Sequence, residues 1–184
     1  MACDNLTLGR IEPCKDSVGG IKNIYFVSYG SMSVEYDNTD TDVIDVVGSG
    51  ISAYQYEVRS TASTFTQNIQ SSRDAGTTAF EQVLEVTLKK LSIDDHKEIK
   101  LLSYNRPHIV VEDNNGNLFL AGLEYGMDVT GGTIVTGGAM ADLSGYTLSL
   151  TGMEKVPANF MVPAAGATGA TNMAKLGFTV VPGA

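Results

Sequence analysis

The sequence predicts a mainly β protein, an antiparallel β-sandwich or barrel with one flanking α-helix. Segments in which apolar and polar side chains alternate recur along the chain between Gly-containing turns, which is the pattern of strands that bury one face. One segment alone has the caps and charges of a helix. We expect a β domain over residues 21–156, between extended arms at residues 1–20 and 157–184.

The chain is acidic, and its composition narrows the classes of function. It has 184 residues with a formal net charge of −9 and no cluster of Lys and Arg, so we do not expect it to grip nucleic acid through phosphates. No apolar run has the length of a membrane-spanning helix, and the first residues lack the pattern of a secretory signal. We expect a soluble protein made in a cytoplasm, without membrane contact.

Two cysteines, Cys3 and Cys14, and two histidines, His96 and His108, are the residues that could suggest a metal. A structural zinc ion needs four ligands, and these histidines fall on a predicted helix and before a predicted strand. We therefore expect reduced thiols, no metal and no cofactor.

Three strands are expected first, over residues 21–29, around 32–36 and over 43–47. The acidic segment between the last two could suggest a calcium loop. With Asn38 at the first position, however, Val43 stands where such a loop needs Gly and Ser49 where it needs Glu. A solvated turn is the better interpretation.

Residues 48–53 match the G-x-G-x-x-A fingerprint of dinucleotide-binding proteins. That motif works only where a helix begins, because the helix N-terminus receives the pyrophosphate. The next residues, AYQYEVRS, alternate as a strand does. We expect a glycine turn between strands.

A long β-hairpin is predicted over Tyr54–Lys90, with its turn in the polar segment Gln67–Gly76. Such a hairpin is too long for one small domain to bury, so we expect it to continue a sheet into a neighbouring copy. Its apolar face would meet the core and its polar face would line a channel. The candidate lumen-facing residues are Gln55, Glu57, Arg59, Glu81, Glu85 and Thr87.

A helix is predicted over about residues 93–104. Ser92 is a suitable N-cap, and Asp94 and Asp95 place negative charge in the first turn, where the helix dipole favours it. A second hairpin follows, in which residues 109–111 and 118–121 flank the Asn-Gly turn.

The last strands are expected at residues 127–130 and 146–151, on either side of a flexible loop that twice contains Thr-Gly-Gly. From Pro157 the chain is rich in small and apolar residues without a period, so we expect an arm that docks on another copy. The candidate contact residues of this arm are Phe160, Met161, Val162, Phe178, Val180 and Val181.

Over roughly residues 50–160 the segments follow in the order YEVRSTASTFTQNIQSS to FEQVLEVTLKKL, SIDDHKEIKLLSYN, VVEDNNGNLFLAG and DLSGYTLSLTGMEKVPANF. This order resembles tail-tube-type proteins of bacteriophages. The last segment, a Gly-Tyr strand that ends in Gly-x-Glu and then Pro, is similar to the closing strand of such proteins in phages of Bacteroides-like bacteria.

The resemblance implies a fold of tail-tube type and a structural protein of the virion, assembled in the host cytoplasm. Copies would form rings, with six copies expected, that stack as a tail tube or a tail adaptor and contact other phage tail or connector proteins. DNA would leave through this conduit without specific binding.

No convincing nucleophile or acid–base pair suggests an enzyme, and we do not expect one. The alternative function is a β-sandwich binding or adhesion module, which would need exposed aromatic clusters or ion sites on loops.

Overall fold

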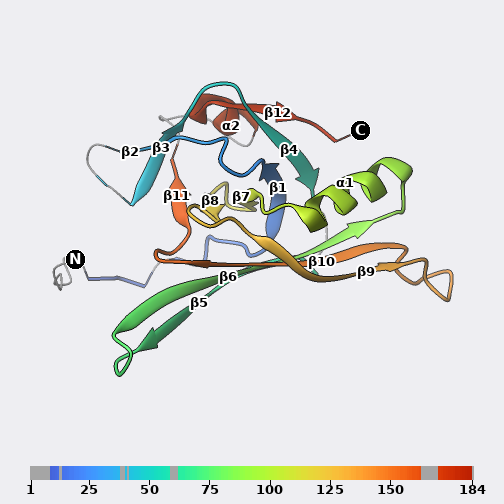
Figure 1. Cartoon of the computed structure of the whole chain (residues 1–184), viewed down its shortest axis with the longest axis horizontal. Coiled ribbons are helices and arrows are strands. Elements are labelled where there is room, and N and C mark those ends of the chain that lie inside the picture. The colour runs from blue at the N-terminus through green and yellow to red at the C-terminus, as the bar shows by residue number, and fades with distance from the viewer. Residues whose placement is uncertain are drawn as a thin grey trace.

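The chain folds into two curled β-sheets and two helices, which confirms the mainly β class (Figure 1). The computed structural model describes residues 9–12, 14–37, 40, 42–58, 62–162 and 170–183. Figure 1 shows the larger sheet, sheet A, above the smaller one, sheet B. The arrangement is consistent with a sandwich or half-barrel.

Sheet A has eight strands in the order β12-β4-β1-β7-β8-β11-β3-β2. Two of its pairings, β11 with β3 and β12 with β4, are parallel, so this sheet is mixed rather than wholly antiparallel. Its strands are β1 (Ile21–Val27), β2 (Val34–Tyr36), β3 (Val43–Val47), β4 (Ile51–Glu57), β7 (His108–Asp113), β8 (Leu118–Ala121), β11 (Asn159–Met161) and β12 (Phe178–Val181).

Sheet B has four strands in the order β5-β6-β10-β9, and all of its pairings are antiparallel. Its strands are β5 (Thr64–Ser72), β6 (Thr77–Lys89), β9 (Asp128–Val135) and β10 (Gly145–Glu154). One face of sheet B packs against sheet A. Buried Leu84 and Leu150 from this face meet Ile24 and Val111 of sheet A in the first hydrophobic core.

A second hydrophobic core fills the curl of sheet A on its other face. Tyr25, Ile44 and Leu118 contribute to it from three different strands. Helix α2 (Ala170–Leu176) closes the curl, with Met173 and Leu176 wholly buried. The central strands of sheet A, such as β1 and β7, are therefore buried on both faces, whereas sheet B is covered on one.

Helix α1 (Ile93–Tyr104) begins and ends where the sequence predicts. The Ser92 side chain accepts a hydrogen bond from the backbone N–H of Asp95, which confirms the N-cap. Buried Ile99 anchors the helix to the first core, and Leu91 and Leu102 pack beside it.

The hairpin of β7 and β8 is confirmed, and its turn residue Gly116 has a φ of 88°, which glycine adopts without strain. The turn after β3 is confirmed as well. Gly50 has a φ of 79°, and strand β4 follows, so no helix begins where a dinucleotide would need one.

The predicted hairpin over residues 54–90 is wrong in its first strand. Residues 54–57 belong to β4, which pairs with β1 and β12 in sheet A. The hairpin consists of β5 and β6, and most of the polar segment expected as its turn is strand. Alternation set the faces of β6 correctly, but in β4 the face that carries Gln55 meets the second core, and Tyr54 is exposed.

The glycine-rich segment near residues 130–135 is strand β9, not a flexible loop. The sheet itself explains one glycine here, because a Cβ at Gly132 would lie 2.5 Å from the backbone oxygen of Thr147. Glycine lets β9 approach β10 closely.

The expected C-terminal arm is largely part of the domain. Strand β11 lies inside sheet A between β8 and β3, and β12 forms the edge of the sheet beside β4. The segment also contains α2, a second helix that its small residues did not predict.

Candidate assembly surface and buried polar sites

The outer face of sheet B is an open polar surface. Directly paired residues of neighbouring antiparallel strands share a face, and one such row consists of Thr87, Thr147 and Thr133. Hydroxyl pairs connect the strands, from Thr133 to Thr147 and from Thr130 to Thr151. The face follows from the period-two alternation in β6 and β10, whose other residues fill the first core.

Three carboxylates and one ammonium lie in the rows of this face, a net charge of −2: Glu81, Glu85, Asp128 and Lys89. The Glu81 carboxylate accepts hydrogen bonds from the side-chain amides of Asn68 and Gln70, at 3.3 and 3.2 Å. Three predicted lumen-facing residues, Glu81, Glu85 and Thr87, are thus brought together on one sheet face.

The other predicted lumen-facing residues do not join them. Gln55 and Glu57 lie on β4 in sheet A, and Arg59 lies outside the described residues. The Gln55 side chain donates a hydrogen bond to Asn23 Oδ1 at 3.2 Å. One sheet face therefore cannot carry all six residues, because the predicted hairpin joined two segments that belong to different sheets.

Within the described residues, sheet B ends in two unpaired edges, β5 and β9. Because all its pairings are antiparallel, these two edge strands run in opposite directions. A second copy placed edge to edge in the same orientation would therefore meet β5 with its β9 in an antiparallel pairing.

The arm residues divide into two groups. Met161 and Phe178 are buried in the second core, and Val180 packs against it. On the other hand, Phe160, Val162 and Val181 are exposed. Only this second group is available to another chain.

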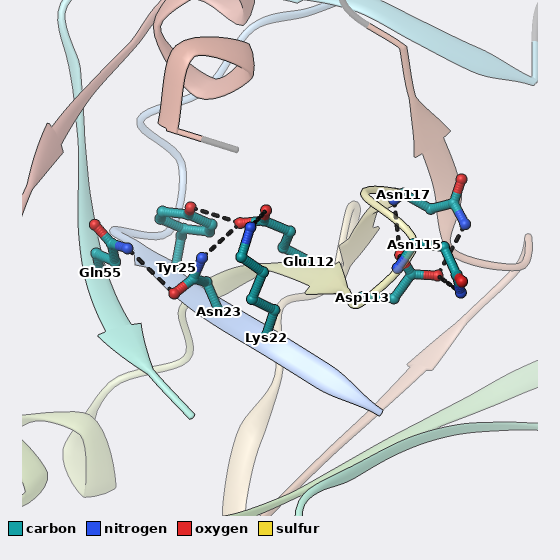
Figure 2. A network of polar contacts seen from close by, with 8 residues as sticks. All are labelled: Lys22, Asn23, Tyr25, Gln55, Glu112, Asp113, Asn115 and Asn117. Carbon is teal, nitrogen blue, oxygen red and sulfur yellow. Dashed lines mark hydrogen bonds and ion pairs between the residues drawn. The ribbon is translucent and has the colours of Figure 1, made fainter. Parts of the chain in front are cut away.

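A buried polar network lies in the curl of sheet A, centred on Glu112 (Figure 2). Glu112 Oε2 accepts hydrogen bonds from Asn23 Nδ2 at 2.7 Å and Tyr25 Oη at 2.9 Å. The ammonium of Lys22 lies 3.2 Å from Oε1. Lys22 is the extra residue of a β-bulge in β1, and such bulges turn a side chain toward a new partner.

We interpret this network as one that stabilises the fold by joining neighbouring strands. The Glu112 side chain is fully buried, and a buried carboxylate is tolerated only when it is paired and hydrogen-bonded, as it is here. Burial, together with the bond to Glu112, raises the pKa of Tyr25, so its hydroxyl stays protonated and acts as a donor. Sequence reasoning missed Glu112, although the acidic pair Glu112 and Asp113 directly after the apolar run IVV was a usable signal.

The β7–β8 turn is held rigid by Asp113 (Figure 2). Its carboxylate accepts hydrogen bonds from the backbone and side-chain amides of Asn115 and Asn117, between 2.7 and 3.1 Å. These bonds hold the pKa of Asp113 below its usual value, against the opposing effect of its partial burial.

The same turn clamps the segment before β1. The Asn115 amide pairs in both directions with the backbone of Val18, at 2.9 and 2.8 Å. Asn114 donates to the backbone oxygen of Gly19 at 2.8 Å. This clamp fixes where the N-terminal segment joins the domain.

His108 is buried and uses both ring nitrogens. Its Nε2 accepts from the backbone N–H of Gly30 at 3.1 Å, so Nδ1 carries the proton and donates to the Gly122 oxygen at 2.6 Å. Tyr29 stacks on the ring, and Arg106 lies over Tyr29. Burial lowers the pKa of His108, with a smaller contribution from nearby Arg106, and keeps the ring neutral.

Glu154 is a second buried carboxylate, at the end of β10. It accepts hydrogen bonds from the backbone N–H groups of Glu124 and Tyr125. Burial raises its pKa even though these bonds oppose the shift. His108, Glu112 and Glu154 each have their own partners, so they do not form a shared reaction site.

Within the described residues, no three His, Cys, Asp or Glu side chains are placed to hold a metal ion. Over the same part of the chain, no helix has the length and apolar character needed to span a membrane. No family model matches the sequence, and neither a curated protein nor a solved structure is significantly similar to it.

Proposed function

We propose that this chain is a structural protein of a bacteriophage virion, whose copies form rings that stack as a tail tube or tail adaptor and give DNA a conduit. The observation that carries this proposal is sheet B: one face supports the core, the other is open and largely polar, and both edges lack a partner strand among the described residues. A free edge invites pairing, and a closed ring of copies removes it.

The outer face of sheet B suits the inner wall of such a conduit. Thr and Ser are its commonest side chains, Val83 and Met153 are among its apolar ones, and its charged rows give a net charge of −2. Phosphates bind to clustered cations, which this face lacks within the described residues. Duplex DNA would therefore pass with little adhesion.

The first test of the proposal is the size of the protein in solution, by light scattering and negative-stain images over a range of concentrations. We expect rings or tubes. A chain that stays monomeric at every concentration, and also with its tail partners present, would contradict the proposal and favour the binding-module alternative.

The second test reverses charge on the outer face of sheet B. Glu81→Lys with Glu85→Lys should leave rings intact but slow DNA passage through assembled particles, because both lysines would face the phosphates. Glu35→Lys with Asp45→Lys changes the net charge equally but in sheet A, and serves as the matched control. Equal DNA passage in both variants would remove sheet B from the channel wall.

A further inference from the structure

Sheet A is wider than the part that sheet B covers. One row of directly paired residues crosses sheet A on the face toward sheet B, in the order Ile24, Val111, Phe119, Phe160 and Val43. Ile24 and Val111 are buried in the first core, Phe119 is half-buried, and Phe160 is 48% exposed. Along this row, sheet B covers the first apolar side chains and leaves the later ones exposed to solvent.

The cover ends at strand β5, the edge of sheet B. Phe65 of β5 lies 6.4 Å from Phe119, ring centre to ring centre, and Phe119 lies 4.7 Å from Phe160. A groove of about 360 Å³ opens between the sheets at this edge, with Ile21, Phe65 and Phe119 among its lining residues. We call the groove and Phe160 together the overhang.

The opposite edge of sheet B has the complementary feature. Ile134 of β9 pairs with buried Tyr146, so it stands on the face that packs on the core. Nevertheless, Ile134 is 53% exposed. The β9 edge of sheet B therefore carries an exposed apolar side chain, Ile134. The β5 edge borders an exposed apolar surface, the overhang.

We propose that the overhang receives strand β9 of a second copy of this chain. That β9 pairs antiparallel with the free edge of β5, which places its Ile134 on the core side of the extended sheet, over the groove and Phe160. The added strand covers the overhang as β5 and β6 cover Ile24 and Val111. This inference rests on the proposed ring assembly and names the contact that closes it.

The direct test is a photo-crosslink. p-Benzoylphenylalanine is placed at Phe160 in the full chain, mixed with isotope-labelled wild-type protein, and irradiated in the assembled state. We expect crosslinks between copies that map to residues 128–135. The same amino acid at Leu101, which is 60% exposed on α1, is the control and should not reach β9 of another copy.

A second test weakens the contact without touching the core. We expect Ile134→Ser and Phe160→Ser each to raise the concentration needed for assembly roughly tenfold or more, because each removes a large apolar group from the contact. Ile93→Ser changes an isoleucine that is 78% exposed on α1, and should assemble as the wild type does. Thermal unfolding of each monomer checks that all three variants fold.

The outcomes separate the two proposals. Rings that form normally in Ile134→Ser and Phe160→Ser, or crosslinks that map away from β9, overturn the overhang contact and leave the ring itself standing. Wild-type protein that never assembles overturns both.

Discussion

The two sheets differ in how they are covered, and the difference is visible in their sequences. Strands β1 and β7 of sheet A, IKNIYFV and HIVVED, are almost entirely buried because a core lies on each side. Strand β6 of sheet B, TTAFEQVLEVTLK, alternates because one face meets water. Substitutions on the buried faces of either sheet should therefore affect stability, whereas those on the outer face of sheet B should not.

The largest loss of stability should follow from removing α2 and β12, which pack on the second core. Deleting residues 170–183 takes away Met173, Leu176 and Phe178, which are all buried. At about 2 kcal/mol or more for each such side chain, we expect a loss of at least about 5 kcal/mol in the free energy of unfolding. Urea unfolding of the monomer measures it; an unchanged midpoint would return this segment to the role of an arm.

A smaller but clear loss in the free energy of unfolding should follow from Glu112→Ala. Its removal leaves the buried donors of Asn23 and Tyr25 without their acceptor, and we expect a loss of about 3 kcal/mol. Glu85→Ala on the open face of sheet B is the matched control and should stay within about 0.5 kcal/mol. Similar losses in both variants would contradict the contrast between the sheets.

The pH dependence of stability should report on His108. Its pKa is lowered in the folded protein, so the unfolded chain binds the proton more readily. The contribution of His108 to the free energy of unfolding is then fully present above about pH 6.5, and it is lost as the pH falls below that value. Protonation removes the acceptor of the Gly30 N–H, a loss of about 1 kcal/mol.

Unfolding measured between pH 7.5 and 5.5 tests this, with His108→Gln and His96→Gln compared. His96 is exposed on α1, so its variant should keep the wild-type profile. A slope that disappears with His96→Gln and persists with His108→Gln would contradict the assignment.

The smallest effect on stability is expected for Thr147→Val, on the open face of sheet B. It removes hydroxyl contacts that water can replace, so we expect a change within about 0.5 kcal/mol. Thermal unfolding measures it, with Leu148→Ala, one residue further and buried in the first core, as the contrast. We expect that contrast variant to lose about 3 kcal/mol.

Local signals in the sequence predicted local structure well. Ser92 located α1, the Asn-Gly pair located the β7–β8 turn, and alternation assigned the faces of β6. Each of these signals acts over a few residues.

Pairing between distant segments could not be read in the same way. Residues 54–57 alternate as a strand of either sheet would, and their partner, β1, lies about thirty residues earlier in the chain. The Glu112 network joins β1, β4 and β7, so it exists only once the three strands are adjacent. Of the candidate surface, the sequence predicted Glu81, Glu85 and Thr87, whereas the overhang depends on the unequal widths of the two sheets.

Sheet B has four strands, and this even number limits which strand insertions or deletions would still allow copies to pair edge to edge. With an even number, the two edge strands run in opposite directions, so identical copies can join edge to edge antiparallel for any number of copies. An odd number would make every junction parallel. Insertions into this sheet should therefore be tolerated as whole hairpins and not as single strands. In the proposed ring, the number of copies would be set by the twist of the sheet and not by its strand count.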